Sequence, residues 1–119
     1  MKENVIKNKS FAFALRIVKL YQYLISEKKE FVLSKQLLRS GTSIGALVRE
    51  AEHAESNADF IHKLAIALKE ANESEYWIEL LYQSGYIDDI AFNSISVDTT
   101  ELLKLLIAIL KSSKANGKR

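Results

Sequence analysis

Proline is absent from the 119-residue sequence, and glycine occurs only four times. Because these two residue types interrupt helices most strongly, their scarcity favours long continuous helices. No segment shows the apolar–polar alternation that is typical of β-strands. Cysteine is absent as well, which excludes disulfides and thiolate metal sites and fits a reducing compartment. We therefore expect an all-α, cytoplasmic protein.

Long hydrophobic runs are also lacking. The most apolar stretch, "LLKLLIAIL", is interrupted by Lys104 and is far shorter than the roughly 20 residues that a membrane-spanning helix needs. The first residues, "MKENVIKNKS", have no apolar segment of the kind found in secretory signal peptides. We expect no association with a membrane.

Charged residues, in contrast, are abundant and unevenly distributed. Residues 1–49 contain ten Lys and Arg and three acidic residues, residues 50–101 contain two and twelve, and residues 102–119 contain five and none. The net charge of the whole chain is only +2. This separation is typical of a polyanion-binding face, or of complementary faces that meet within or between subunits.

Apolar residues recur at helical spacing in four segments. The predicted helices lie at about residues 10–27, 35–54, 57–84 and 88–114. Their short connections predict a single domain, residues 1–119, folded as an antiparallel up-down-up-down four-helix bundle. A mobile basic tail is expected at residues 112–119.

Local signals place the helix ends. Ser34 is the predicted N-cap of the second helix, and Ser56 or Asn57 that of the third. Gly85 is placed to end the third helix. The segment "NSISVDTT" is rich in poor helix formers, and we expect it to weaken the fourth helix.

The first helix carries two apolar stripes. One contains Phe13, Ile17, Leu20 and Leu24, and the other contains Phe11, Ala14, Leu15, Val18, Tyr21 and Ile25. Together they cover about half of the helix circumference, which is wider than a surface helix usually needs. The surplus predicts a second packing partner, such as another subunit.

The stretch "LLRSGTSIGALVREA" has two interpretations. A phosphate-binding loop of the Walker type needs G-x-x-x-x-G-K-[ST] after a strand, but Gly41 and Gly45 are too close and no Lys follows Gly45. In a helix, this spacing places both glycines on one side. We therefore interpret Gly41, Ser43 and Gly45 as room for the close approach of a neighbouring helix.

Two acid–histidine pairs raise the alternative of a di-metal carboxylate bundle. Glu50 and His53 match the motif Glu-x-x-His, and Asp59 and His62 resemble it. However, the pairs flank a single turn, and the first helix has no interior carboxylate. Neither histidine has a Ser and Asp partner that would support a catalytic triad. We expect a non-enzymatic protein without catalytic residues, metal ligands or cofactors.

Acidic residues gather in the third helix around the dipeptide "YW". The simpler interpretation is a solvated, charged helix face. The alternative is that Glu70 or Glu73 pairs with Arg39 or Arg49 across the bundle. Such a pair would orient the helices more than it would stabilise them.

Two rows of cations are candidate nucleic-acid contacts. The first consists of Lys9, Arg16, Lys19 and Tyr23, and the second of Lys104, Lys111, Lys114 and Lys118. Antiparallel packing could bring the ends of these helices into one basic surface. Cations neutralise phosphates without reading base sequence, and Tyr can stack on an unpaired base. A merely solvated face is the alternative.

The segment "LLRSGTSIGALVREAEHAESNADFIHKLAIALKEANESEYWIELL" resembles the bacterial four-helix-bundle family of 23S rRNA intervening-sequence proteins, which includes accessory proteins of diversity-generating retroelements. The likeness extends from about Phe11 to Leu110, and "RSGTSIGA", "KE" and "YW" carry it. It implies homopentameric rings without established catalytic residues. For the retroelement branch it also implies a basic nucleic-acid-binding surface and a reverse transcriptase as partner. Leu47 stands where related sequences commonly have Asn.

Two functions of different classes follow from these patterns. The first is a homo-oligomeric bundle that binds RNA or DNA weakly through the basic rows. The alternative is a protein–protein interaction scaffold without nucleic-acid binding, whose acidic and basic regions meet neighbouring subunits or a protein partner. Charge reversal at Arg16 and Lys19 would impair nucleic-acid binding in the first case and assembly in the second.

Overall fold

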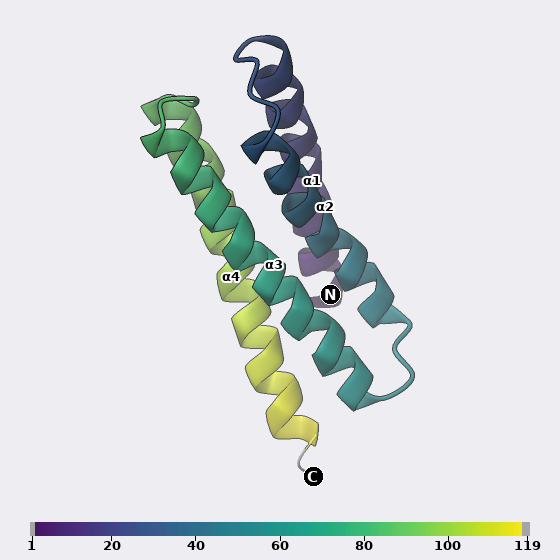
Figure 1. Cartoon of the computed structure of the whole chain (residues 1–119). Helices are drawn as coiled ribbons and strands as arrows, with labels where there is room; N and C mark the ends of the chain where they lie inside the picture. Colours follow the sequence, from purple (N-terminus) through teal and green to yellow (C-terminus); the bar gives the residue numbers. More distant parts are fainter. Residues whose placement is uncertain (1, 118–119) are drawn as a thin grey trace.

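The structure, a computed structural model, describes residues 2–117 and the side chains of residues 5–116. Its four helices are α1 (Lys2–Ser26), α2 (Leu33–Glu52), α3 (Asn57–Gln83) and α4 (Asp89–Gly117). Consecutive helices are antiparallel and form an elongated bundle of 51 × 21 × 21 Å (Figure 1). No strand occurs in residues 2–117. The predicted all-α four-helix bundle is thus confirmed.

The first helix begins eight residues earlier than predicted. The buried side of α1 consists of Ile6, Ser10, Phe13, Ile17 and Leu24. Because Ile6 lies one turn before Ser10 on the same side, its burial extends the helix into the polar N-terminal segment. Because that segment is polar, its sequence did not predict the first turns of the helix.

The fourth helix crosses the segment "NSISVDTT" without interruption. Ile95 and Thr99 are buried within this segment, as is Leu102 just after it, and Thr99 Oγ1 donates a hydrogen bond of 2.8 Å to the Ile95 carbonyl. Packing of this side against the core outweighs the low helix propensity of the segment. The helix also continues through Gly117, so residues 112–117 are helical rather than part of a tail. Lys118 lies outside the described residues.

The start of α2 differs from the predicted cap. Ser34 is not the N-cap, because the helix begins at Leu33 and Val32 occupies the cap position without a side-chain hydrogen bond. Instead, the buried Glu30 carboxylate accepts hydrogen bonds from the N–H groups of Val32, Leu33 and Ser34, at 3.1, 2.9 and 2.6 Å. Burial acts to raise the pKa of Glu30, but these hydrogen bonds outweigh it and keep the pKa below the ordinary 4.5.

Both ends of α3 carry recognisable caps. The Ser56 hydroxyl accepts a hydrogen bond from the N–H of Asp59 at 3.1 Å. After the helix, Gly85 has a φ of +85°, which favours glycine. The N–H groups of Gly85 and Tyr86 donate to the carbonyls of Tyr82 and Leu81, at 3.0 and 2.9 Å. This double hydrogen bond is a Schellman motif, which turns the chain toward α4.

The four helices do not contact one another equally. The contact between α2 and α3 is the most extensive, α1 packs on α2, and α4 packs on α3, whereas α1 meets α4 in far fewer places. The bundle is therefore tightly closed on three sides and more open between α1 and α4.

Candidate interaction surfaces

Gly41 and Gly45 lie where α1 packs closely on α2. A Cβ atom at Gly41 would lie 2.8 Å from Ile17 Cγ1, and one at Gly45 would lie 3.4 Å from the Ser10 carbonyl oxygen. Ser43 is half-buried, and its hydroxyl donates to a carbonyl one turn earlier at 2.9 Å. The stretch is therefore part of a helix–helix contact, and it does not form a phosphate-binding loop.

Arg39 connects α2 with α3. Its Nη1 donates to Glu70 Oε1 at 3.1 Å, and its Nη2 pairs with Glu73. Glu73 also accepts a hydrogen bond of 3.0 Å from Trp77 Nε1. The hydrogen bond from Trp77, followed by that from Arg39, outweighs burial and lowers the pKa of Glu73. Because half of the Arg39 side chain is exposed, this network orients the helices but adds little stability.

Arg49, the other predicted partner, does not pair with Glu70 or Glu73. Its guanidinium carbon lies 4.9 Å from the centre of the Phe11 ring, a cation–π contact between α2 and α1. Arg49 follows Arg39 by almost three helical turns, which places it too far along α2 to reach the same two carboxylates.

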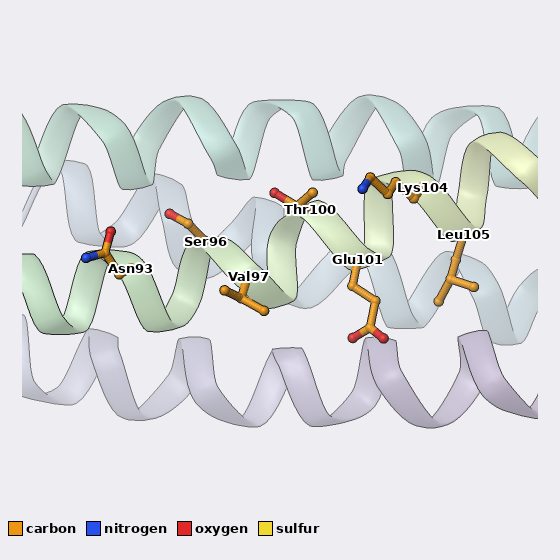
Figure 2. A pocket seen from close by; sticks show the side chains of 7 residues that line it. All are labelled: Asn93, Ser96, Val97, Thr100, Glu101, Lys104 and Leu105. Atoms are coloured by element: carbon orange, nitrogen blue, oxygen red, sulfur yellow. The ribbon is translucent and has the colours of Figure 1, made fainter.

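Two of the predicted nucleic-acid contacts form ion pairs with residues of the same chain. Lys9 pairs with Glu101 at 3.0 Å, and Arg16 pairs with Asp98 at 2.7 Å, both between α1 and α4. Figure 2 shows Glu101 directed toward α1, while Lys104 extends on the side of α4 that faces α3. Glu101 and Asp98 therefore interrupt the basic surface that was expected between α1 and α4.

The other predicted contacts within the described residues are exposed. Lys19 and Tyr23 lie on α1, and Lys104, Lys111 and Lys114 lie on α4. The three α4 lysines span about 15 Å of helix. Lys104 borders a shallow hollow on the outer side of α4 (Figure 2), and the other lining residues are Asn93, Ser96, Val97, Thr100, Glu101 and Leu105. All walls of this hollow come from one helix, so it encloses no ligand site.

The two apolar stripes of α1 have different environments. Phe13 and Ile17 are buried in the core, whereas Phe11, Leu15 and Val18 are 48%, 51% and 36% exposed. These three residues follow one another at helical spacing on the side of α1 that faces away from the core. We call Phe11, Leu15 and Val18 the outward stripe. The Arg49 side chain of α2 lies over the Phe11 ring, and about half of Phe11 and Leu15 stays exposed.

An apolar groove of about 420 Å³ opens where all four helices meet near the N-terminal end of α1. Its lining residues are Val5, Ile6, Val48, Ala51, Glu52, Phe60, Leu64, Leu105, Ala108, Ile109, Ser112 and Ser113. This groove was not predicted from the sequence, because the first turns of α1 were not recognised as helical. The spacing of Ile6 relative to Phe13 and Ile17 is the signal that could have revealed it.

The acid–histidine pairs do not converge on a metal site. Glu50 accepts a hydrogen bond of 3.0 Å from Lys63 Nζ, which raises the pKa of that lysine. His53 and His62 are exposed. Within the described residues, no three His, Asp or Glu side chains gather as metal ligands. None of the described helices is long and apolar enough to cross a membrane.

Together, these features define a small antiparallel four-helix bundle whose exposed lysines and outward stripe face the solvent. The chain belongs to the family of 23S rRNA-intervening sequence proteins, whose family model matches residues 2–108. The family assignment made from the sequence is thus confirmed. Leu47 is half-buried and packs against the core.

A solved structure with the same fold comes from Bacteroides thetaiotaomicron. It is the crystal structure at 1.70 Å of a protein of unknown function from the S23 ribosomal protein family. The two sequences are 64% identical, the match covers 93% of this chain and 99% of that chain, and the TM-score is 0.92. No curated protein sequence matches this chain.

Proposed function

We propose that this protein acts by association rather than by catalysis, and that it assembles with copies of itself through the outward stripe of α1. The proposal rests on one observation. Three large apolar side chains lie exposed on a helix whose opposite side already fills the core. Covering the exposed part of each side chain would contribute about 1 kcal/mol. The homopentameric ring implied by the family resemblance is one assembly of this kind.

The charges near the outward stripe favour an acidic neighbouring surface. Lys19 is exposed directly after Val18, and the Arg49 guanidinium lies over the Phe11 ring. Exposed carboxylates on α3, such as that of Glu75, offer the opposite charge on a second copy. The scaffold interpretation of the sequence therefore gains support from the same region as the apolar stripe.

The test is sedimentation velocity of the wild-type chain and of Leu15→Lys at micromolar concentration. We expect the wild type to sediment as an oligomer and Leu15→Lys as a monomer, because the variant places a charge in the middle of the stripe. Thr100→Lys is the matched control, since it adds the same charge to an exposed position of α4, on neither of the two helices proposed to meet. A monomeric wild type, or an unchanged oligomer in Leu15→Lys, would contradict the proposal.

Weak nucleic-acid binding is the second candidate function. It is favoured by the exposure of Lys104, Lys111 and Lys114 on one helix. Because Lys9 and Arg16 already have carboxylate partners, these three lysines and Lys19 are the better phosphate contacts. If each of the three α4 lysines contacts one phosphate, the logarithm of affinity should fall with the logarithm of salt concentration at a slope of roughly −2 to −3.

Fluorescence anisotropy with RNA and DNA oligonucleotides at low salt tests this second function. The variant in which Lys104, Lys111 and Lys114 are all replaced by Ala should lose most of its binding. Replacement of Lys35, Lys63 and Lys69 by Ala is the control of equal charge. Absence of binding by the wild-type chain, or equal loss in the two triple variants, would argue against the α4 lysines as a nucleic-acid site.

A further inference from the structure

Three of the most exposed large apolar side chains lie at one end of the bundle. Phe31 and Val32 are 59% and 70% exposed, and Ile90 is 81% exposed. Phe31 and Val32 belong to the α1–α2 connection, and Ile90 lies in the first turn of α4, directly after the α3–α4 connection. Figure 1 shows both connections at the same end of the molecule. Both connections at this end therefore carry exposed apolar side chains, and these are distinct from the outward stripe.

The α1–α2 connection is held firmly in place. The Glu30 carboxylate accepts three backbone N–H groups of the following residues, and the Glu30 N–H donates to the Leu24 carbonyl at 3.0 Å. Lys29 adopts a φ of +55° to make this turn. Phe31 and Val32 are therefore exposed by a well-bonded turn, so binding through them would cost little conformational entropy.

The α3–α4 connection is bonded in a comparable way. The Asp88 carboxylate accepts the N–H of Ala91 at 2.8 Å. The Tyr82 hydroxyl donates to Asp89 at 2.5 Å, and the Tyr82 ring stacks on Phe92 with centroids 4.0 Å apart. These contacts order the first turn of α4, in which Ile90 extends into solvent.

The two connections carry opposite charge. Lys28 and Lys29 are exposed beside Phe31 and Val32, and we call these four residues the basic tip. Asp88 and Asp89 are exposed beside Ile90, and we call these three residues the acidic tip. Each molecule thus presents one basic and one acidic apolar surface at the same end.

We propose that this end of the bundle binds the same end of a second copy around a twofold axis. The basic tip of each copy then contacts the acidic tip of the other copy, so the same pair of complementary surfaces forms twice in the dimer. A second copy is the fitting occupant because one chain supplies both complementary surfaces, and opposite charges across an interface select the pairing. This contact does not depend on the outward stripe, which lies along the side of α1.

A charge exchange tests the pairing. One variant carries Lys28→Glu and Lys29→Glu, and the other carries Asp88→Asn and Asp89→Lys, where Asn keeps a cap for α4. Both are made in the Leu15→Lys background, so that association through the stripe does not contribute. At concentrations above the micromolar range, where the Leu15→Lys protein is expected to be monomeric, sedimentation velocity should show a monomer–dimer equilibrium for this background protein. Each variant alone should dimerise roughly tenfold more weakly, and their equimolar mixture should dimerise again.

Apolar variants test the same surface without changing charge. Phe31→Ser should weaken the end-to-end dimer, whereas Tyr76→Ser, at a side chain of similar exposure on α3, should leave it intact. Circular dichroism confirms that each variant folds. The proposal is overturned if the background protein stays monomeric up to about millimolar concentration, or if mixing does not restore the dimer. If the outward stripe forms no contact between copies, the test of the end-to-end dimer still applies. The wild type and the Leu15→Lys background should then dimerise alike.

Discussion

The two contacts of α1 with its neighbours are built on different principles. Against α2, the helix packs at glycines, where a Cβ at Gly41 would lie 2.8 Å from Ile17. Against α4, it is connected by the pairs Lys9–Glu101 and Arg16–Asp98, whose side chains are 38–46% exposed. The first contact depends on shape and excludes water, whereas the second is open to solvent and screened by salt.

This difference explains how one helix can be anchored in the fold and still leave one side exposed for the proposed interface. The glycine contact anchors α1 in the bundle through its buried side. The looser contact with α4 and the outward stripe leave the rest of its surface available for another molecule. We therefore expect stability to depend mainly on the α1–α2 contact, and assembly to depend on the outward stripe.

The largest effect is expected from a bulky side chain in the glycine contact. Gly41→Leu places new atoms where Ile17 already lies, and Ile17 is completely buried. The α1–α2 contact must then open, and we expect a loss of about 3 kcal/mol in the free energy of unfolding. Urea denaturation measures it. A loss below about 1 kcal/mol would show that α1 is not closely packed on α2.

A smaller effect is expected at the turn that joins α1 to α2. Glu30→Ala removes the acceptor of three N–H groups and should cost about 1–2 kcal/mol at pH 7. The pKa of Glu30 is lowered in the folded state, so its contribution is present above about pH 4.5 and is lost as the pH falls further.

Urea denaturation at pH 7 and pH 3 tests this dependence. The difference between wild type and Glu30→Ala should be smaller at pH 3, because below the ordinary pKa of 4.5 the unfolded chain binds a proton at Glu30 more readily than the folded chain does. Glu30→Gln, which keeps one acceptor oxygen, should lose less than Glu30→Ala at pH 7. A difference that is equal at both pH values would rule out the charged cap.

The sequence was sufficient for the helices but not for the roles of their surfaces. Helical spacing identified four helices and both apolar stripes of α1, because periodicity depends on local geometry alone. It could not tell which stripe is buried, since Phe11 and Phe13 differ only in the direction they face after packing. Likewise, Lys9 and Arg16 resembled free cations until the fold placed Glu101 and Asp98 beside them. The cap of α2 was missed because Glu30 reaches forward from outside the helix.

Gly45, the second glycine of the α1–α2 contact, is expected to tolerate a Cβ atom, unlike Gly41. A Cβ at Gly45 would meet the Ser10 carbonyl oxygen at 3.4 Å, an ordinary contact distance. Gly45→Ala should therefore gain helix propensity without a clash and raise stability by up to about 1 kcal/mol. Thermal unfolding measures this gain. If Gly45→Ala and Gly41→Ala prove equally destabilising, the two positions are not distinguished by packing as described.

The smallest effect is expected at the α1–α4 ion pairs. Arg16→Gln should cost less than about 1 kcal/mol, because both charges are well exposed. The cost should also shrink further between 0.05 M and 1 M NaCl, since salt screens exposed pairs. Urea denaturation at the two salt concentrations checks this. A loss of several kcal/mol that is insensitive to salt would place these pairs among the main stabilising contacts.

We propose that the outward stripe is covered by another copy of the chain, and thiol labelling at this stripe tests the proposal most directly. Because the sequence has no cysteine, a single Leu15→Cys can be labelled selectively with a thiol reagent, with Thr100→Cys at an exposed position of α4 as control. As the protein concentration rises from nanomolar to tens of micromolar, the labelling rate of Leu15→Cys should fall while that of Thr100→Cys stays constant. A labelling rate of Leu15→Cys that does not change with concentration would contradict the account.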